Sequence, residues 1–347
     1  VGDEFYKTYG YFIDFEKYGQ AAIQAANIIN NGGELLIKRV VASDATLANI
    51  VVVANVTADR VQKTDIEGNP LYLDPVTQQE ITDPGEGNEK VMVNVATVKY
   101  DVVTVVGKET IGQIVAEAKR SFIEDEETQT FSYPLFVITD NGRGASTKRF
   151  GIEPQYNISK NQNFMIYKLK YLGSEDLDAE SIYFSLVPGI MYVQKSMDIG
   201  MACHDMLQCD AAPIDDAIEA FYEKISEISG LSINEVYKND PLFGRSNRNT
   251  PVTGIALDVS GQDLGVSMGF GLDGGSNGSF GECPIDTVEY ENALLDFYNG
   301  TFNEDIFNLD MYKPDACIDA NYPYAVKKAI YELAKFRKDF YFFGDLG

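Results

Sequence analysis

The chain has 347 residues, of which 45% are hydrophobic, and 53 acidic residues outnumber 28 Lys and Arg to give a formal net charge of −25. This length and apolar content indicate a globular protein of two or three domains. The acidic excess excludes a basic nucleic-acid footprint and attraction to an anionic membrane surface, and no apolar run is long enough for a transmembrane helix.

The first ninety residues predict a helix, two strands and a polar excursion. Residues 14–33 carry apolar side chains at helical spacing and end in a Gly-Gly pair, a common helix stop. Residues 34–42 and 49–58 have the apolar, β-branched composition of strands. Residues 59–90 are rich in Asp, Gly, Pro and Asn without the spacing of a calcium loop, which indicates turns and solvated loops.

The middle of the chain is predicted to be mainly β-structure with two clear helices. Residues 109–122 form an amphipathic helix, and residues 213–229 form a longer one with Pro213 in its first turn. Ser232 and Glu235 have the spacing of a capping box at the start of a third helix. Strands are predicted within residues 91–107, 133–160, 163–173 and 181–193.

The last hundred residues alternate between strands and helices. Asp286 and Glu289 are placed to cap one helix, and Pro323 suits the first turn of another. A strand, a helix and a strand with short links predict a parallel pair joined by a crossover. The fold class is therefore α/β with α+β mixing, with strands over 253–260, 264–270, 305–314 and 339–347 and helices over 286–300 and 322–338.

Residues 267–284, "SMGFGLDGGSNGSFGECP", contain Gly269, Gly271 and Gly274 at the spacing G-x-G-x-x-G. A dinucleotide-binding loop needs these glycines to lead directly from a strand into a helix that holds the pyrophosphate. Here residues 275–285 intervene before the helix expected near Asp286. The motif therefore predicts a turn, and we expect no bound cofactor.

The cysteines and the single histidine do not form a recognisable site. Cys203, His204 and Cys209 lie close in sequence, but their spacing fits no common zinc site. The Met-rich and Cys-rich surroundings of His204 favour buried packing over a role as a base, and sequence neighbours such as Asp205 are no evidence for a catalytic pair. We expect unpaired thiols in a reducing compartment, no catalytic or metal-binding residues, and no enzyme activity; the other two cysteines are Cys283 and Cys317.

The segment "GRGASTKR" places Arg143, Lys148 and Arg149 near Gly142 and Gly144. Such a cluster can hold a phosphate, and in an acidic chain it can equally steer a protein–protein contact. An ordinary exposed turn between two strands is the third interpretation. The residues alone leave these three alternatives open.

Three segments, in order, resemble the sheath protein of contractile bacteriophage tails. Residues 15–49 are similar to the family's N-terminal pattern of a helix, a Gly-Gly stop, a strand that ends in Arg-Val and an Ala-rich continuation. Residues 272–280 are similar to the family's L-x-G-G-x-D-G turn, with Asn277 where Asp is usual, and residues 317–343 are similar to the helix and strand that follow, with Arg337 and Asp339 fitting an R-x-D signature. The matching positions are Phe15, Tyr18, Gly19, Gly32, Gly33, Arg39, Val40, Ala45 and Ala48 in the first segment and Leu272, Gly274, Gly275 and Gly278 in the second.

The resemblance implies a discontinuous α/β core from residues 1–58 and 250–347 and an outward-facing β-rich insertion from residues 59–249. It further implies a subunit that polymerises head-to-tail around a tail tube and contracts as its interfaces switch, to drive DNA delivery into the host. Its partners would be other copies, the tube protein and the baseplate, in the virion after assembly in the bacterial cytoplasm. Arg39 and Arg337 would help to hold the core.

Two other functions remain open. A further question is whether the chain is a fragment of a longer protein. The protein resembles equally a sheath subunit of a related contractile injection system, and its 21 Tyr without Trp allow a surface carbohydrate-binding module. Because the chain begins at Val1 and stops after a predicted strand, we expect a fragment that lacks the family's terminal arms and C-terminal region and is itself monomeric.

Overall fold

The computed structural model shows an α+β fold in which mixed helices and sheets form two compact units. Unit 1 comprises residues 1–46, 142–145 and 275–347, and unit 2 comprises residues 47–141 and 146–274. The described residues are 20–35, 37, 40–65, 67–125, 127, 130–155, 164–172, 181–189, 193, 198–240, 254–257, 268–281, 283, 285, 287–299 and 313–344.

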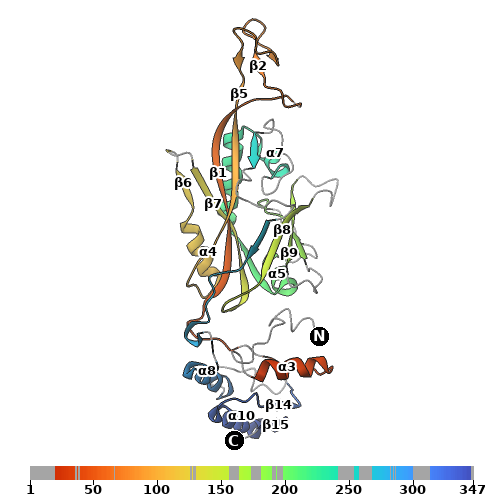
Figure 1. The fold of residues 1–347 in the computed structure, drawn as a ribbon, viewed down its shortest axis with the longest axis vertical. Coiled ribbons are helices and arrows are strands. Elements are labelled where there is room, and N and C mark those ends of the chain that lie inside the picture. The colour runs from red at the N-terminus through yellow and green to blue at the C-terminus, as the bar shows by residue number, and fades with distance from the viewer. Residues whose placement is uncertain are drawn as a thin grey trace. The chain divides into compact units, whose positions relative to one another are not determined.

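The main sheet of unit 2 has the strand order β11-β7-β1-β5-β12, with β6 also paired to β7. β1 and β5 form a long antiparallel ribbon, and β12 pairs with β5 in parallel (Figure 1). Every residue of Leu47–Ala54 in β1 is buried, as expected for a strand covered on both faces. The bounds are β1 Leu47–Gln62, β5 Met92–Val103, β6 Ile123–Asp125, β7 Thr130–Arg143, β11 Cys209–Pro213 and β12 Ile255–Leu257.

A second, antiparallel sheet with the order β10-β9-β8-β13 shares one apolar core with the main sheet. Aromatic rings join the two sheets, as where Phe136 of β7 lies 5.9 Å from Phe184 of β10 between ring centroids. The bounds are β8 Arg149–Gln155, β9 Ile166–Tyr171, β10 Ser181–Phe184 and β13 Met268–Gly271. The helices of this unit are α4 Ile111–Arg120, α5 Ile199–Leu207, α6 Asp215–Ser229 and α7 Ile233–Lys238.

Three of the described helices of unit 2, α4, α6 and α7, were predicted from the sequence, whereas α5 was not. The expected stripe of α4, which includes Ile114 and Ala118, packs on β1 and β7. The capping box of Ser232 and Glu235 is present at α7. Pro213 is not in the first turn of α6, however, because it ends β11, where its missing N–H is tolerated at an edge strand.

The expected polar excursion at residues 59–90 contains more structure than predicted. β1 continues to Gln62, and the ribbon ends in a three-stranded sheet of β2 Tyr72–Leu73, β3 Glu80–Ile81 and β4 Glu89–Lys90 (Figure 1). The side chains of Asp65 and Asp74 accept hydrogen bonds from nearby backbone N–H groups and so form its turns. We name this sheet and its turns, residues 63–91, the ribbon tip.

Unit 1 is built from segments at both ends of the chain. α8 and α10 pack through Leu294, Val326 and Ile330, and the parallel pair β14-β15 is joined by α10, as the strand–helix–strand pattern predicts. Gly32 follows α3 with φ +78°, in the left-handed conformation expected of a helix stop. The bounds are α3 Gln20–Asn30, the 3₁₀ helix η3 Gly278–Phe280, α8 Val288–Asn299, β14 Ala316–Ile318, α10 Tyr324–Arg337 and β15 Tyr341–Phe343.

Three local predictions in unit 1 need correction or fall outside the description. The described residues within 34–42 contain no strand, and the first strand of the parallel pair is β14. Most of the strand expected over 305–314 lies outside the described residues, as does Asp286. At the start of α8 it is the Thr287 hydroxyl that accepts a hydrogen bond from the N–H of Tyr290, at 3.2 Å.

The unit boundaries follow strand pairing. β1 is paired with β5 from Val51 to Gln62, so the chain after Thr46 belongs to the sheet of unit 2. The expected boundaries at 58/59 and 249/250 therefore differ from those of the structure at 46/47 and 274/275. In addition, the short segment 142–145 joins unit 1, although the residues on either side of it belong to unit 2.

Candidate functional site

The glycines of the G-x-G-x-x-G motif lie in a strand and a turn. Gly269 and Gly271 pair with β8 as part of β13, and Gly274 follows with φ +73°. A Cβ at Gly274 would lie 2.4 Å from Cγ2 of Thr104, so that position needs glycine for both space and conformation. The next helix is the three-residue η3. The geometry is therefore that of a turn, as predicted, without the strand-to-helix step of a phosphate loop.

The residues after this turn form a hydrogen-bonded cluster within unit 1. Both the backbone N–H and the hydroxyl of Ser279 donate to Asp44 Oδ1, at 2.8 and 3.0 Å. These two bonds lower the pKa of Asp44 below its ordinary value. Gly278 has φ +63°, and a Cβ there would lie 2.2 Å from Asp44 Oδ1. Glycine at this position thus permits the contact between Asp44 and η3.

A third segment completes this cluster. Thr46 N–H donates to the carbonyl of Ser276 at 2.9 Å, and Gly144 N–H donates to the carbonyl of Thr46 at 2.8 Å. Asn277 Oδ1, at the position where the resemblance expects Asp, accepts from Ala145 N–H at 3.3 Å. We call residues 43–46, 142–145 and 276–281 the three-segment hub.

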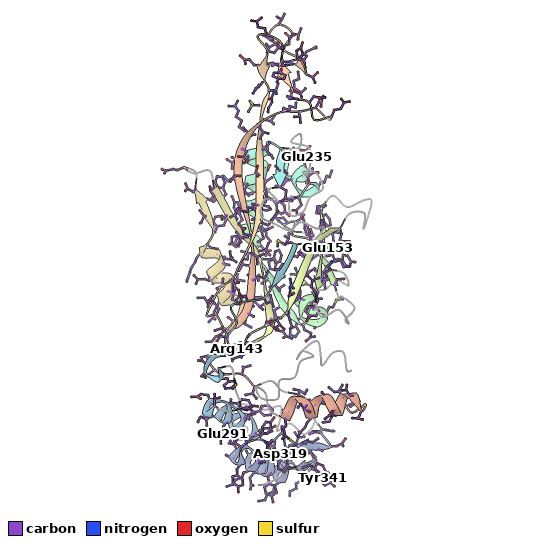
Figure 2. All side chains as sticks on the ribbon, in the orientation of Figure 1. Arg143, Glu153, Glu235, Glu291, Asp319 and Tyr341 are labelled. Carbon is purple, nitrogen blue, oxygen red and sulfur yellow. The ribbon has the colours of Figure 1, made fainter. Side chains whose placement is uncertain are left out.

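The three basic residues of "GRGASTKR" make separate contacts. Arg143, labelled in Figure 2, donates from Nη1 to the carbonyl of Ser43 at 3.0 Å. Lys148 is buried and its Nζ lies 2.8 Å from Asp140 Oδ1, while Arg149 is exposed on β8. Because the Lys148 charge is already compensated by a buried carboxylate, these contacts do not support the phosphate-binding interpretation.

The prediction that His204 is packed inside the protein is wrong. α5 packs through Ala202, Cys203 and Leu207, so the adjacent His204 faces outward, and 58% of its side chain is exposed. Its Nδ1 lies 3.0 Å from Asp210 Oδ1, a pairing that sequence adjacency did not suggest. The structure therefore directs His204 and Cys203 to opposite sides of α5, and they do not form a nucleophile and base.

All four cysteines are free thiols, and burial leaves little reactivity expected at Cys203 and Cys209. Cys203 and Cys209 are buried together, and their contact and burial raise the pKa of Cys203 well above its ordinary value. A protonated buried thiol is a poor nucleophile and a poor metal ligand. Among the residues that the structure describes, no three His, Cys, Asp or Glu side chains gather as a metal site would require.

The R-x-D signature forms a bidentate ion pair. Arg337 Nε and Nη2 donate to the two carboxylate oxygens of Asp339, at 2.9 and 2.7 Å, and only 1% of the Arg337 side chain is exposed. The guanidinium lowers the pKa of Asp339. This pair fixes the turn between α10 and β15, whereas Arg39 lies outside the described residues.

A second clamp ties three segments of unit 1 together. Lys327 Nζ lies 3.0 Å from Asp319 Oδ2, and both side chains are at most 10% exposed. Gln24 Nε2 donates to the Asp319 carbonyl at 3.0 Å, which attaches α3 to the chain after β14. Asp319 is labelled in Figure 2. The end of the chain and its N-terminal helix are thus joined by polar contacts.

Unit 1 exposes several large apolar side chains. These side chains lie on β14, α10 and β15 and are 44% to 75% exposed. Tyr and Phe are enriched in protein interfaces, so exposed aromatic side chains favour contact with another protein. We name these six side chains together the C-terminal aromatic surface, and they are Ile318, Tyr324, Tyr331, Phe336, Tyr341 and Phe343.

The pattern of α10 contains a signal for this surface. Val326, Ile330 and Leu333 form the buried stripe, whereas Tyr324 and Tyr331 are two helical turns apart on the opposite side. Lys328 and Lys335, both exposed, lie between and beyond these two tyrosines at helical spacing. Two apolar stripes on one helix indicate two contacts, whereas the sequence pattern had predicted the helix without either stripe.

Small-molecule binding has less support. A hollow of about 290 Å³ beside α4 is lined by polar side chains. Two of its cations, Lys108 and Arg120, already pair with Glu117, at 3.2 and 3.0 Å. Ligand sites are typically larger and more apolar, with a few converging polar groups left to orient the ligand.

A comparison with protein-family models finds no match for the chain, and a comparison with curated protein sequences finds none either. Within the described part of the chain, no helix is both long and apolar enough to cross a membrane. Function is therefore argued from the residues and their geometry.

Proposed function

We propose that the chain is a structural subunit of a contractile bacteriophage tail sheath. It polymerises helically around the tail tube and contracts to drive DNA delivery, so its role is mechanical and not enzymatic. Its partners are copies of itself, the tube protein and the baseplate, and it resides in the virion after assembly in the host cytoplasm. The observation that carries this proposal is the C-terminal aromatic surface of unit 1.

The exposed aromatic residues favour association with a protein. Tyr341 of β15, labelled in Figure 2, is 75% exposed, and Phe343 on the same face of the strand is 60% exposed. A two-stranded sheet such as β14-β15 is marginally stable alone and gains stability when further strands or a packed surface cover it. A subunit of a polymer supplies such a cover from its neighbour, which a monomeric enzyme does not.

The motifs that carry the sheath resemblance have consistent structural roles. Gly278 and Asn277 both belong to the three-segment hub, and Arg337 with Asp339 fixes the end of α10. These positions serve backbone geometry in unit 1. Motif residues that maintain backbone geometry support a structural subunit of an assembly.

The arrangement of the two units also supports the proposal. Unit 1 combines residues 1–46 with 275–347, and unit 2 is inserted between them. In a sheath subunit the core from both chain ends carries the polymer contacts, and the insertion decorates it. A sheath subunit of a related contractile injection system has the same requirements and remains the alternative.

Negative-stain electron microscopy tests this function. We expect tubes or rings from the product of the complete reading frame that contains this chain. The double variant Tyr331→Ser/Tyr341→Ser should abolish them, whereas Val76→Ser, which replaces an 88% exposed residue of the ribbon tip, should not. Dispersed monomers of the wild-type product under all conditions would contradict the proposal.

Mass spectrometry of purified phage particles distinguishes the two contractile machines. A tail sheath contributes many copies to each virion, so its peptides should be among the most abundant after those of the capsid. Their absence from virions, together with tubes from the recombinant protein, would instead support the injection-system alternative.

A further inference from the structure

Strand β7 begins in unit 2 and its last residues join unit 1. The strand pairs with β11 up to Asp140, yet residues 142–145 belong to unit 1 before the chain returns to unit 2 at Ser146. We call residues 142–145 the excursion. The covalent chain thus passes from unit 2 to unit 1 here, in addition to its passages at 46/47 and 274/275.

The base of the excursion is held rigidly inside unit 2. Lys148 and Asp140, one on each side of it, form a buried ion pair at 2.8 Å with side chains that are 9% and 10% exposed. Lys148 Nζ also donates to the carbonyl of Gln208, and Asn141 Nδ2 donates to Gln208 Oε1 at 3.1 Å. Gln208 itself adopts φ +51°, which fixes the link from α5 to β11.

The far end of the excursion is bonded to residues that lie far away in sequence. Gly144 N–H donates to Thr46, Arg143 donates to Ser43, and Ala145 N–H donates to Asn277, as described for the three-segment hub. Gly144 has φ +128°, a conformation that L side chains rarely adopt. The excursion is therefore one of the three chain segments whose hydrogen bonds hold the hub together.

We propose that the excursion is a coupling device that makes the stability of unit 1 depend on the packing of unit 2. While the base is held in place, the excursion forms its hydrogen bonds to the other two hub segments with little further loss of conformational entropy. When the base opens, the excursion becomes part of a flexible loop, and forming the same hydrogen bonds costs more conformational entropy. This inference stands apart from the sheath proposal, because it rests only on the excursion and its bonds.

The coupling is reciprocal, as any equilibrium coupling must be. Opening of the base removes the anchor of the excursion and weakens the hub, and opening of the hub weakens the base by the same free energy. The contacts of the base, made by Asp140, Lys148 and Gln208, lie within unit 2. A substitution in the base is therefore expected to change local opening in the hub.

Hydrogen exchange measured by mass spectrometry on the intact chain tests the coupling. The variant Asp140→Asn/Lys148→Met removes both buried charges together, so that no unpaired ion remains. We expect amides of residues 276–281 in the hub to exchange roughly ten-fold faster, although neither substitution lies in unit 1.

A matched variant controls for general loss of stability in unit 2. Glu153→Gln/Lys170→Met removes another ion pair of unit 2, between β8 and β9, with side chains 21% and 23% exposed. Exchange of residues 276–281 should stay at the wild-type rate in this variant. Equal acceleration in both variants, or no acceleration in either, would overturn the proposal.

A third variant tests the hub end and replaces the first should that protein fail to fold. Gly144→Pro removes the N–H that donates to Thr46 and forbids the observed φ. It should accelerate exchange at 276–281 about ten-fold and leave the β1 and β5 amides unchanged. Gly87→Pro, at a ribbon-tip glycine that also has positive φ, is its control. Wild-type exchange at the hub in Gly144→Pro would likewise overturn the coupling.

Discussion

The two units of this protein are stabilised in different ways. Unit 2 buries a continuous apolar core between two sheets, with aromatic residues such as Phe136, Phe150 and Tyr167 fully inside. Unit 1 has three small apolar clusters and depends on polar clamps, notably Asp44 with Ser279 and Arg337 with Asp339. A large core tolerates the loss of polar contacts better than a set of small clusters does.

The difference has a consequence for function. Unit 1 exposes large aromatic side chains that a bigger core would have buried, and it is made of segments that start far apart in sequence. On the sheath proposal, a neighbouring copy that covers these side chains would stabilise unit 1. Four substitutions test the difference between the two units, and their expected effects decrease in the order given.

The largest effect is expected in the core of unit 2. Phe136→Ala removes a ring that is 1% exposed and packs against Phe184, so it should lower the free energy of unfolding of unit 2 by about 3–5 kcal/mol. Urea unfolding, monitored by hydrogen exchange of the β1 and β5 amides, measures this change in the free energy of unfolding. Val76→Ala should change that free energy by less than about 0.5 kcal/mol. A small effect of Phe136→Ala would show that this core is loosely packed.

The second prediction distinguishes a steric clash of an added Cβ from backbone strain at positive φ in unit 1. Gly278→Ala places a Cβ against Asp44 at positive φ and should destabilise unit 1 by about 2–3 kcal/mol. Gly281→Ala has φ +60° without any heavy atom within 4 Å of the added Cβ, so it should cost only about 1 kcal/mol. Thermal unfolding, monitored by hydrogen exchange of the α8 amides, compares the stability of the two variants. Equal losses would mean that the contact with Asp44 does not constrain the hub.

The third effect depends on pH. Asp339→Asn breaks the bidentate pair with buried Arg337 and should destabilise unit 1 by about 1–2 kcal/mol at pH 7. Because Arg337 lowers the pKa of Asp339 in the folded state, the pair stabilises unit 1 above the ordinary Asp pKa. This contribution is lost as the pH falls below the ordinary Asp pKa and through the lowered pKa of the folded state.

Acid unfolding of the wild type and two variants checks the sign. The wild type should lose its advantage over Asp339→Asn as the pH drops below about 4, and the two stability curves should converge. Asp296→Asn, at an exposed carboxylate of α8, should follow the wild-type curve. A constant difference between wild type and Asp339→Asn down to low pH would exclude the ion pair as the cause.

The smallest effect on stability is expected at the C-terminal aromatic surface. Tyr331→Ser replaces a side chain that is 49% exposed and should change the free energy of unfolding by less than about 0.5 kcal/mol. The same change should weaken association of the complete protein, as sedimentation would measure. A stability loss of several kcal/mol would instead place Tyr331 in the fold of unit 1.

Sequence reasoning predicted the elements that carry strong periodicity. The apolar stripes of α4, α6 and α10 and the β-branched runs of β1 and β5 are local signals, because helix and strand geometry repeat along the chain. The glycine turn at Gly274 was likewise predicted, from the absence of a helix directly after it. The described residues within 34–42 are not in a strand, although the composition of this segment favoured one.

Contacts between distant segments were not predictable in this way. Lys148 looked like part of a basic surface cluster but is buried against Asp140, and His204 looked buried but is exposed beside Asp210. In both cases the environment of the side chain depends on how the neighbouring strands and helices pack together. No local pattern around Lys148 or His204 contains that information.

Local patterns were enough to predict the fold class, most of the main helices and strands, and the acidic charge. These properties follow from local periodicity, from turn-forming residues and from simple counts, which need no knowledge of tertiary contacts. Tertiary contacts were needed to place residues 142–145, which begin at the end of β7, in unit 1. They were also needed for the hydrogen bond from Ser279 to Asp44 and for the exposure of six apolar side chains on β14, α10 and β15. The reason is that burial and hydrogen bonding between distant segments depend on the packing of the whole chain.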